Sequence, residues 1–563
     1  MSEKDKRQAK PGTVTPIAPP LEVASADEVS WSDEADVLVV GWGAAGASAA
    51  IEARAQGAEV IVIDRFNGGG ASALSGGVVY AGGGTRYQHE AGYRDSPQAM
   101  AAYLRHEVNG VVSDATLQRF CDDSVANLQW LEAQGARFAS TTPKFKTSYP
   151  PDGIYLYYSG NEVVPAYQDP ATPDKPAPRG HRVVAKGQSG ATLMAALMDS
   201  TLRAGARAIT QASVRRLVRE RRADGQPGRV LGVEIWELPV GHARTRRHAQ
   251  LDALIAKWRL YQPGRAEAGR REAAAIEREL ARPRFVRARR GVVLSTGGYI
   301  YNPELIAQHA PHYRSGWPIG GAGCDGSGLR LAQGAGAAAD HLDNVSGWRF
   351  ITPPYAWPKG LVVNQRGERF CNEQVYGAKL GYEMVERHGG RAWLLMDSRL
   401  RRQSTWQCLF GRLWAFQSLP ALMLMFKVAK KAATLEDLAR QIGADAATLK
   451  RHVAAANTAA RGEGADAFGK SPDMRQPLEK APFYAIDISI DQKMFPLATL
   501  TLGGLRVNEV DGHVVDAGGR EIDGLFAAGR TAVGLASSRY VSGLSLADCV
   551  FSGRRAGRAA AGV

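Results

Sequence analysis

The sequence predicts an α/β fold with a mainly parallel sheet, and three neighbouring runs of residues support this. Residues 36–40 (DVLVV) form an apolar run, which is typical of a buried parallel strand. Residues 47–57 are rich in alanine and end in a glycine, which is typical of a helix and its stop signal. A second, mostly apolar run at 59–63 (EVIVI) returns to the sheet. Strand, helix and strand in this order form the first unit of a Rossmann-like domain.

A glycine motif lies at the turn between the first strand and the helix. Gly41, Gly43 and Gly46 stand in G-x-G-x-x-G spacing, and Asp64 ends the second strand 18 residues later. The first glycine permits a tight turn, the second lets the backbone approach a pyrophosphate, and the third lets the helix pack closely on the strand. A carboxylate at the end of the second strand accepts hydrogen bonds from ribose hydroxyls. We therefore predict a bound dinucleotide, against the alternative of a glycine-rich turn without a ligand.

The glycines that follow favour FAD over NAD. The chain holds 63 glycines in 563 residues, which exceeds the usual share of roughly 7%. A second glycine-rich loop at 67–85 comes directly after the acid, and the runs 291–298 (GVVLSTGG) and 524–530 (GLFAAGR) are typical of strands that end in glycine turns. A parallel sheet brings such strand ends to one edge. An extended cofactor such as FAD can contact all of them.

The net charge of +14 is concentrated in one stretch. Residues 241–290 hold 14 Lys or Arg against 5 Asp or Glu, and we interpret them as a basic helical insertion. Either these charges are solvated, or they attract an acidic partner such as an anionic lipid surface or another protein. We expect no nucleic-acid partner, because no aromatic and basic recognition motif accompanies the charge.

No His or Cys spacing fits a metal-ligand set, so we predict no metal. The scattered cysteines suit a reducing compartment.

The polar lead-in and the apolar runs predict a cytoplasmic protein. Residues 1–32 are polar and rich in proline, so we predict a flexible N-terminal segment rather than a signal peptide. No run of 18 uncharged apolar residues exists, and the nearest, 409–428, is interrupted by Arg412, Pro420 and Lys427. This run either dips into one leaflet at the inner face of the membrane, or packs inside the fold or a subunit interface. Peripheral membrane contact is therefore one of two hypotheses.

Five motifs in one order resemble those of the fumarate reductase/succinate dehydrogenase flavoprotein superfamily. They are GWGAAG, the GGGAS…SGG loop, STGG, RFCNE (369–373) and GLFAAGR with the tail SGLSLADCVFSGRRAG. The resemblance extends over 36–563, apart from the insertions at 241–290 and 400–430. It implies a discontinuous FAD-binding domain that is interrupted by a smaller α+β catalytic, or capping, domain, with the flavin between them.

The resemblance also implies a division of the chain. The predicted parts are a first FAD-binding segment at 33–325, the catalytic domain at 326–489 and a second FAD-binding segment at 490–563.

The groups that bind dicarboxylates in this superfamily are missing here. The superfamily carries His before a T-x-G-G segment and Arg shortly after the N-E pair, whereas this chain has ATLTLGG (498–504) and Tyr376. The His that binds flavin covalently is absent from 67–77, so the resemblance implies noncovalent FAD. Tyr376, together with Tyr540 and Ser542 in SRYVSGLS, is similar to the 3-ketosteroid dehydrogenases that act at carbons 4 and 5.

This similarity implies a flavin-dependent desaturation of a 3-ketosteroid at C4–C5. A hydride passes from C5 to flavin N5, and a proton passes from C4 to a tyrosine base. We assign Tyr540 as the base, Tyr376 as a relay or supporting acid, and Ser542 as a supporting group that alternatively caps the C-terminal helix. A tyrosinate requires neighbours that lower its pKa from the usual value of about 10. Backbone N–H groups around Gly543 are candidate donors to the ketone oxygen.

The motifs and the resemblance together give the predicted cofactor contacts. These are Gly41, Gly43, Ala44, Ala45, Gly46, Asp64, Arg65, Gly70, Ala71, Ser72, Ser75, Gly76, Gly77, Thr296, Gly297, Gly298, Asp325, Gly529, Arg530, Ser545 and Leu546. Tyr355 and Trp357 are candidate pocket aromatics. The predicted electron acceptor is a quinone or an electron-transfer protein. Alternative functions are a 3-ketosteroid 1,2-dehydrogenase, although the Tyr-Pro-Gly segment of those enzymes is absent, and an enoyl- or acrylate-type reductase on the same scaffold.

Overall fold

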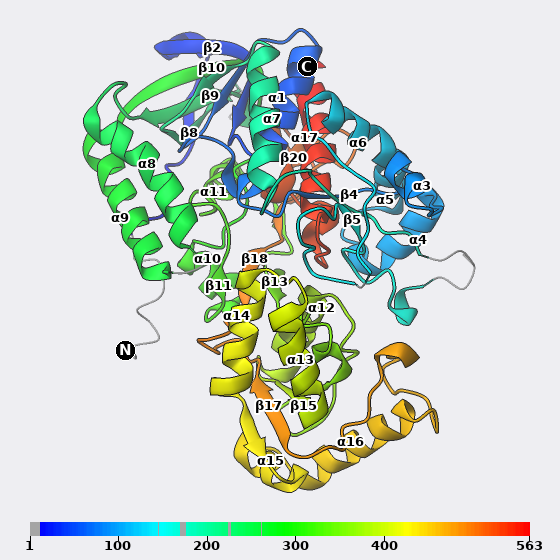
Figure 1. Ribbon diagram of the computed structural model, residues 1–563. Coiled ribbons are helices and arrows are strands. Elements are labelled where there is room, and N and C mark those ends of the chain that lie inside the picture. Colours follow the sequence, from blue (N-terminus) through cyan, green and yellow to red (C-terminus); the bar gives the residue numbers. More distant parts are fainter. Residues whose placement is uncertain (1–11, 145, 169–175, 223–226, 260–261, 563) are drawn as a thin grey trace.

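The protein has two lobes, and the chain passes from the larger lobe to the smaller one and back (Figure 1). The computed structural model describes residues 12–144, 146–168, 176–222, 227–259 and 262–562. The larger lobe contains the main sheet, and the smaller lobe contains an antiparallel sheet. The predicted fold class, a discontinuous Rossmann-like domain interrupted by a smaller α+β domain, is confirmed.

The main sheet has nine strands, and its centre is parallel. The strand order is β1-β8-β9-β10-β2-β3-β7, with β21 paired to β10 and β20 paired to β21. Strands β7, β3, β2, β10 and β21 run parallel to one another, whereas β9 is antiparallel to both β8 and β10, and β20 is antiparallel to β21. The bounds are β1 Leu21–Val23, β2 Trp31–Val40, β3 Val60–Ile63, β7 Arg207–Ile209, β8 Ala212–Arg221, β9 Pro227–Glu237, β10 Arg282–Leu294, β20 His513–Val515 and β21 Glu521–Ala527.

The register of the parallel strands aligns their carboxyl ends. Val40 lies opposite Ile63 on one side and Leu294 on the other, and Leu294 lies opposite Ala527. Each of these residues is followed by one of the turns that the sequence marks with glycine or Asp64. The four turns therefore come together at one edge of the sheet, as the strand pattern predicts.

Three helices pack together beside the parallel strands (Figure 1). They are α1 (Ala44–Ala55), α7 (Gly190–Arg203) and the C-terminal α17 (Leu544–Gly562). A Cβ added at Gly557 of α17 would lie 2.2 Å from the carbonyl oxygen of Ala49 of α1. The two helices approach this closely because glycine has no side chain at the contact.

The basic insertion is a pair of helices followed by a strand. Helices α8 (Ala243–Trp258) and α9 (Pro263–Leu280) agree with the predicted helical insertion at 241–290. Its last part, 282–290, instead belongs to β10, because these residues pair with β9 and β2. Ion pairs join α8 to α9, so part of the positive charge is neutralised within the insertion. Attraction to an acidic partner stays a prediction.

The smaller lobe is built on a four-stranded antiparallel sheet. Its order is β14-β15-β17-β16, with bounds Leu361–Val363, Trp393–Met396, Phe483–Asp487 and Lys430–Ala432. The helices of this lobe are α12 Gly377–Tyr382, α13 Ser398–Phe410, α14 Ala415–Met423, α15 Leu435–Ile442 and α16 Ala446–Ala460.

Short strands join the two lobes. Strands β11 (Trp317–Pro318), β18 (Ala498–Thr501) and β13 (Val345–Trp348) form one small sheet at the junction (Figure 1). The predicted domain boundaries at 325/326 and 489/490 separate β13 from its two partners. These boundaries stay a prediction.

The remaining elements lie mostly around the larger lobe. The strands are β4 Val78–Tyr80, β6 Gly180–Arg182 and β5 Leu156–Tyr157 in one sheet, and β12 Ala339–Asp340 with β19 Gly504–Leu505 in another. The helices are α2 Gly70–Ala73, α3 Arg86–Glu90, α4 Pro97–Val108, α5 Asp114–Asp122, α6 Ser124–Ala133, α10 Pro303–His309 and α11 Ser327–Gly334.

The N-terminal segment differs from its prediction. Residues 1–11 lie outside the described part of the chain, but 12–32 pack on the larger lobe rather than forming a flexible lead-in. Strand β1 pairs with β8, and both the N–H and the Oγ1 of Thr15 donate to Oδ2 of Asp325, at 2.7 and 2.6 Å. These contacts are distant in sequence, so composition alone did not reveal them.

Within the described residues, no helix has both the length and the apolar character needed to cross a bilayer.

Candidate active site

A cavity of about 660 Å³ lies between the two lobes. One part of its wall is formed by the turns at the edge of the main sheet. The opposing part is formed by aromatic residues of the smaller lobe and its junction, and by helix α14. Tyr376, Tyr540 and Ser542, which lie far apart in sequence, all line this cavity. The predicted cofactor region and the predicted catalytic residues therefore share one space.

The wall at the main sheet is made of backbone turns. Gly41 has a φ of +99°, and a Cβ at this position would lie 2.6 Å from the carbonyl oxygen of Ser295. The carboxylate of Asp64 accepts hydrogen bonds from the N–H groups of Trp42 and Phe66, both at 2.8 Å. These contacts fold the glycine motif and the end of β3 against each other. A ligand here meets the backbone itself, because few side chains intervene.

This wall fits the diphosphate and ribose of FAD. Gly43 caps the N-terminus of α1, where backbone N–H groups favour an anion. A Cβ at Gly70 would meet nothing within 4 Å, which shows open space against the backbone of the second glycine loop. The indole Nε1 of Trp42 is buried and has no hydrogen-bond partner among the described residues. It lines the cavity and can donate to a ligand oxygen.

Most of the predicted cofactor contacts line the cavity. They are Gly41, Gly43, Ala44, Ala45, Asp64, Arg65, Gly70, Ala71, Ser72, Ser75, Gly76, Thr296, Gly297, Arg530, Ser545 and Leu546. Five others lie outside its lining, and their assignment as contacts stays a prediction. These are Gly46, Gly77, Gly298, Asp325 and Gly529.

The four glycines of this second group permit close packing behind the cavity wall. A Cβ at Gly46 would lie 1.9 Å from the carbonyl oxygen of Gly41, and one at Gly298 would lie 2.3 Å from Oγ1 of Thr501. The sequence marks these positions as special but does not distinguish a glycine that faces a ligand from one that faces a neighbouring strand. Only the packing separates the two.

Asp325 and Arg65 also form part of a largely buried ionic network. Arg65 Nη1 lies 3.0 Å from Asp325 Oδ2, and its Nε lies 2.8 Å from Glu277 Oε1 on α9. His248 Nε2 of α8 lies 2.9 Å from the same glutamate oxygen. Burial alone would raise the pKa of Glu277, but these partners hold it at about 2. The network fixes the basic insertion to the end of β3, beside the cavity.

The other wall of the cavity is aromatic. Tyr540 packs edge-on against Trp348, with ring centroids 4.8 Å apart, and Phe350 lies between Trp348 and Tyr376 at 6.2 and 5.5 Å. Such contacts fix the orientation of each ring. Trp357, a candidate from the sequence, also lines the cavity, whereas Tyr355 does not. This wall suits an apolar, polycyclic ligand.

Two tyrosine phenols, those of Tyr376 and Tyr157, lie beside Ser542. Tyr376 is hydrogen-bonded to Ser542, and Tyr157 OH lies 3.4 Å from Ser542 Oγ. Burial, followed by the neighbouring phenols of Tyr540 and Tyr157, raises the pKa of Tyr376 well above its usual value. The Ser542 N–H donates to the Ser159 carbonyl, so it is engaged and does not serve as a donor to a ketone.

The environment of Tyr540 differs from the sequence expectation. Burial raises the pKa of its phenol to about 12, and the charge of Arg530 only partly opposes this. We expected neighbours that lower this pKa below its usual value. A buried phenol is neutral near pH 7, so proton removal by Tyr540 requires that its own proton leaves first or at the same time.

One short segment, residues 159–161, holds both Tyr376 and Ser542, and no sequence motif indicates it. The side-chain oxygen of Asn161 accepts the Tyr376 N–H at 2.6 Å, and Asn161 Nδ2 donates to Glu107 at 2.7 Å. Ser159 Oγ donates to the Ser542 carbonyl at 2.9 Å. The segment thereby links the C-terminal turn to the residue that begins helix α12. No motif marks these residues, because their roles depend on partners more than 200 positions away.

Other cavity residues were also missed. They come from the junction (Trp348, Phe350, Phe495, Leu500), from α8 and its end (Asp252, Ala253, Ala256, Arg259) and from α14 and the turn after it (Phe416, Gln417, Pro420, Ala421, Leu424). The sequence set the last two groups apart as departures from the superfamily. It did not indicate that both insertions reach the cavity.

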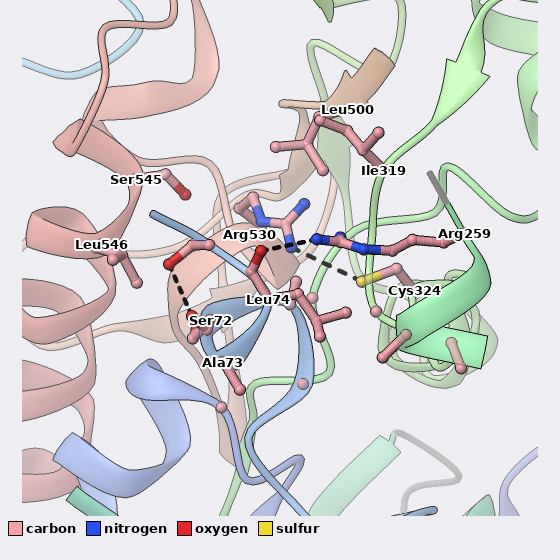
Figure 2. A pocket seen from close by; sticks show the side chains of 18 of the residues that line it. Ser72, Ala73, Leu74, Arg259, Ile319, Cys324, Leu500, Arg530, Ser545 and Leu546 are labelled. Carbon is pink, nitrogen blue, oxygen red and sulfur yellow. Dashed lines mark hydrogen bonds between the residues drawn. The ribbon is translucent and has the colours of Figure 1, made fainter. Parts of the chain in front are cut away.

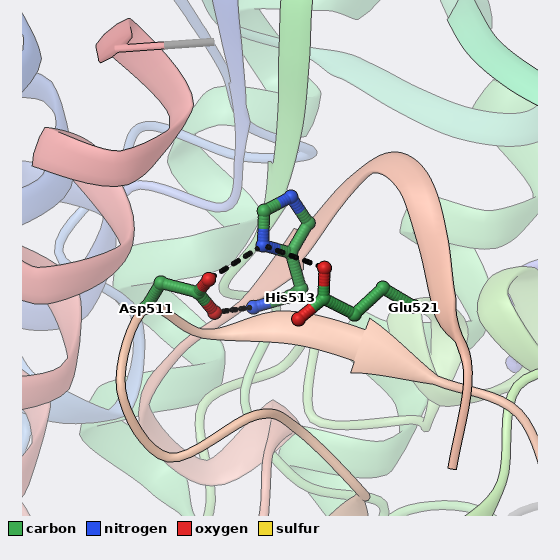
Figure 3. A group of neighbouring side chains, drawn as sticks. All are labelled: Asp511, His513 and Glu521. Carbon is green, nitrogen blue, oxygen red and sulfur yellow. Dashed lines mark hydrogen bonds and ion pairs between the residues drawn. The ribbon is translucent and has the colours of Figure 1, made fainter.

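A group of three potential metal ligands lies away from the cavity. Asp511, His513 and Glu521 come together at the β20–β21 hairpin, with their ligand atoms within 4.8 Å of one another (Figure 3). His513 Nδ1 lies 2.9 Å from Asp511 Oδ2 and 3.8 Å from Glu521 Oε2. The prediction of no metal stays a prediction.

The chain matches known proteins over both lobes. The family model described as FAD binding domain matches residues 36–546. The chain is 59% identical over 530 residues to 3-oxo-5-alpha-steroid 4-dehydrogenase from Comamonas testosteroni, covering 92% of this chain and 96% of that protein. It is 28% identical to 3-oxosteroid 1-dehydrogenase from Mycobacterium tuberculosis, covering 90% and 94%.

A solved structure matches almost the whole chain. It is 3-ketosteroid-delta4-(5alpha)-dehydrogenase from Rhodococcus jostii RHA1 in complex with 4-androstene-3,17-dione. The two chains are 30% identical, with a TM-score of 0.79, and the match covers 97% of this chain and 100% of that one.

Proposed function

The chain belongs to the FAD-binding domain family, and we propose that it is an FAD-dependent 3-ketosteroid 4-dehydrogenase. The observation that carries this proposal is the convergence of Tyr376, Tyr540 and Ser542 on the cavity that the glycine turns also line. The 59% identity to a 3-oxo-5-alpha-steroid 4-dehydrogenase supports the position of the new double bond at C4–C5. The aromatic wall supports a polycyclic, apolar substrate.

FAD is the cofactor, and when bound it supplies the acceptor for the hydride that leaves C5. Gly41, Gly43 and the N-terminus of α1 hold its diphosphate, and Asp64 accepts from its ribose. We propose that FAD is bound noncovalently. Trp348 and Phe350 position the steroid and exclude water from the reacting carbons.

The chain's part in the reaction is the removal of the C4 proton. Tyr540 faces the cavity and takes this proton as its own phenol proton leaves. Tyr376, whose phenol lies near that of Tyr540, receives the displaced proton and passes it through Ser542 to Tyr157, beyond the cavity wall. The C3 oxygen gains negative charge during this transfer, and a donor to it lowers the barrier. Backbone N–H groups near Gly543 stay a prediction for that donor.

Anaerobic mixing with a 5α-reduced 3-ketosteroid tests the proposal. We expect the flavin absorbance to bleach and the product to carry a C4–C5 double bond by mass spectrometry and NMR. A C1–C2 double bond would indicate a 1,2-dehydrogenase instead. Absence of bleaching with any reduced 3-ketosteroid would refute the steroid assignment. The electron acceptor, a quinone or an electron-transfer protein, stays a prediction.

We further propose that the protein contacts a membrane through α13 and α14, at the inner face. An apolar face of these helices and the turn after them is exposed, and we refer to it as the α13–α14 face. Its residues are Trp406, Leu409, Phe410, Phe416, Leu419, Met423 and Phe426, which are 40–66% exposed. Exposed apolar patches of this kind mark sites of interaction.

The charge around this face supports a lipid surface as its partner. No Asp or Glu lies between Asp397 and Glu436, and Arg412, Lys427 and Lys430 are exposed. These cations suit anionic headgroups, whereas two copies of the same basic face would repel each other. Phe416 belongs to both the exposed face and the cavity lining. A steroid dissolved in the membrane therefore has a short path to the cavity.

Sedimentation with vesicles of phosphatidylcholine and phosphatidylglycerol tests this contact. We expect binding at low salt that weakens at high salt, and a loss of about tenfold or more in the triple variant Phe410→Ser, Leu419→Ser, Phe426→Ser. The control triple variant Leu202→Ser, Val240→Ser, Val510→Ser changes exposed apolar residues elsewhere and should bind normally. Unbound protein at both salts would refute the contact. A dimer that the first triple variant dissociates would assign the face to a subunit interface.

A further inference from the structure

Two arginines from different parts of the chain meet in the cavity (Figure 2). Arg259 follows the last residue of α8, in the basic insertion, and Arg530 follows strand β21. Arg259 Nη2 donates to the Leu74 carbonyl oxygen at 2.8 Å, and Arg530 Nη2 lies 3.7 Å from Cys324 Sγ. Figure 2 shows the two guanidinium groups directed toward each other above the second glycine loop.

Both guanidinium groups have donors without partners. Arg259 Nε and Arg530 Nη1 are buried and make no hydrogen bond with any described residue. Arg259 is only 9% exposed, and burial lowers its pKa. Neither arginine has a carboxylate within 4 Å among the described residues, in contrast to Arg65 and Arg369, which are also buried but paired with acids. A buried cation beside a half-buried one, with no counter-charge, is costly unless a ligand supplies electron-rich atoms.

The position of the pair identifies which part of a ligand it meets. Figure 2 shows Leu500 beside Arg530, and Leu500 lies on β18, the strand that pairs with Trp348 of the aromatic wall, so the pair lies toward the junction end of the cavity. The side chains around it, Leu74, Ile319 and Leu500, are apolar, which suits a flat ring.

We propose that Arg259 and Arg530 form a cationic clamp that binds the electron-rich oxygen and nitrogen atoms of the FAD ring system and stabilises the negative charge it gains on reduction. Positive charge beside a cofactor ring favours its reduced form. The basic insertion would thus supply a redox-tuning residue as well as part of the cavity lining. This inference rests on FAD as cofactor, and not on the identity of the steroid.

The midpoint potential of the holoenzyme, measured without steroid, tests the clamp. We expect Arg259→Leu to lose about tenfold in the preference for reduced over oxidised FAD, which corresponds to a fall of about 30 mV for a two-electron couple. FAD affinity, measured by reconstitution, should fall severalfold as well. Arg247→Leu is the matched control, because Arg247 is also on α8 but is exposed, paired with Glu272 and outside the cavity lining.

Two further variants keep the test decisive if Arg259→Leu does not retain FAD. Arg259→Lys keeps the charge and should keep the potential, whereas Arg259→Gln keeps donors without charge and should lower it. A potential in Arg259→Gln equal to that of the wild type would refute the clamp. A changed KM for the steroid with an unchanged potential would also refute it, because it would assign Arg259 to the substrate. Failure of steroid turnover in the wild type leaves this measurement unaffected.

Discussion

The main-sheet wall of the cavity is built from backbone, whereas the aromatic wall is built from side chains. At the first wall Gly41, Trp42 and Asp64 come from 24 consecutive residues and are fixed by local hydrogen bonds. At the second wall Trp348, Tyr376 and Tyr540 come from segments up to 192 residues apart. The first wall therefore depends on backbone conformation, and the second depends on the docking of two lobes.

This difference predicts different failures when each wall is changed. Damage to the main-sheet wall should reduce FAD binding and, through it, stability, because a ligand that binds only the folded state stabilises it. Damage to the aromatic wall should reduce turnover and leave FAD in place. The four predictions below test this separation.

The largest effect is expected from Tyr540→Phe. The change removes the phenol oxygen and keeps the ring that packs on Trp348. Turnover should fall by about 10²–10⁴-fold, which is the usual contribution of a general base, while flavin absorbance and melting temperature stay unchanged. Stopped-flow measurement of flavin bleaching provides the rate. A rate close to that of the wild type would remove Tyr540 from the mechanism.

The second prediction is a rise of the bleaching rate with pH. Burial places the pKa of Tyr540 at about 12, so the deprotonated fraction is small at pH 7. This fraction grows by about tenfold per pH unit below the pKa, and the rate should climb without a plateau between about pH 7 and pH 10. FAD occupancy should stay constant over this range. A plateau near pH 7 would mean that the base is another group, or that FAD binding shifts the pKa of Tyr540 strongly downward.

The third prediction concerns Gly41→Ala. Its positive φ and the 2.6 Å approach to the Ser295 oxygen both oppose a side chain, so FAD affinity should fall by about 10–100-fold. The control is Gly57→Ala, which has a φ of +81° but meets nothing within 4 Å. Reconstitution of the apoprotein measures both. Equal losses in the two variants would attribute the effect to backbone strain alone.

The smallest effect is expected from Asp64→Ala. FAD affinity should fall by about tenfold, because the ribose loses a charged acceptor and the N–H groups of Trp42 and Phe66 lose their partner. Steroid turnover of the fully loaded enzyme should change little. Unchanged FAD affinity would show that the carboxylate only braces the turns.

The two insertions extend the comparison. The α8–α9 pair has internal ion pairs and is anchored through Glu277 to Arg65. Part of its charge is therefore already paired within the protein. The α13–α14 face exposes seven large apolar side chains. Sequence composition suggested interaction surfaces for both, and packing favours only the second. Arg259 at the end of α8 is the part of the first insertion that reaches the cavity.

The sequence by itself determined the features that are local. The strand, the glycine motif and Asp64 lie within one βαβ unit, where spacing alone fixes which atoms meet, and the order of five motifs indicated the family and FAD. The resemblance also provided Tyr376, Tyr540 and Ser542, because each follows a short recognisable segment.

Only the tertiary structure decided which residues share the cavity. It placed Gly46, Gly298 and Asp325 behind the wall, it brought Asn161 to the N–H of Tyr376, and it directed Arg259 toward Arg530. Hydrogen bonds and charge pairs between distant segments have no period and no spacing in the sequence. Their partners are set by how the lobes and insertions pack. The same packing encloses the Tyr540 phenol and thereby raises its pKa.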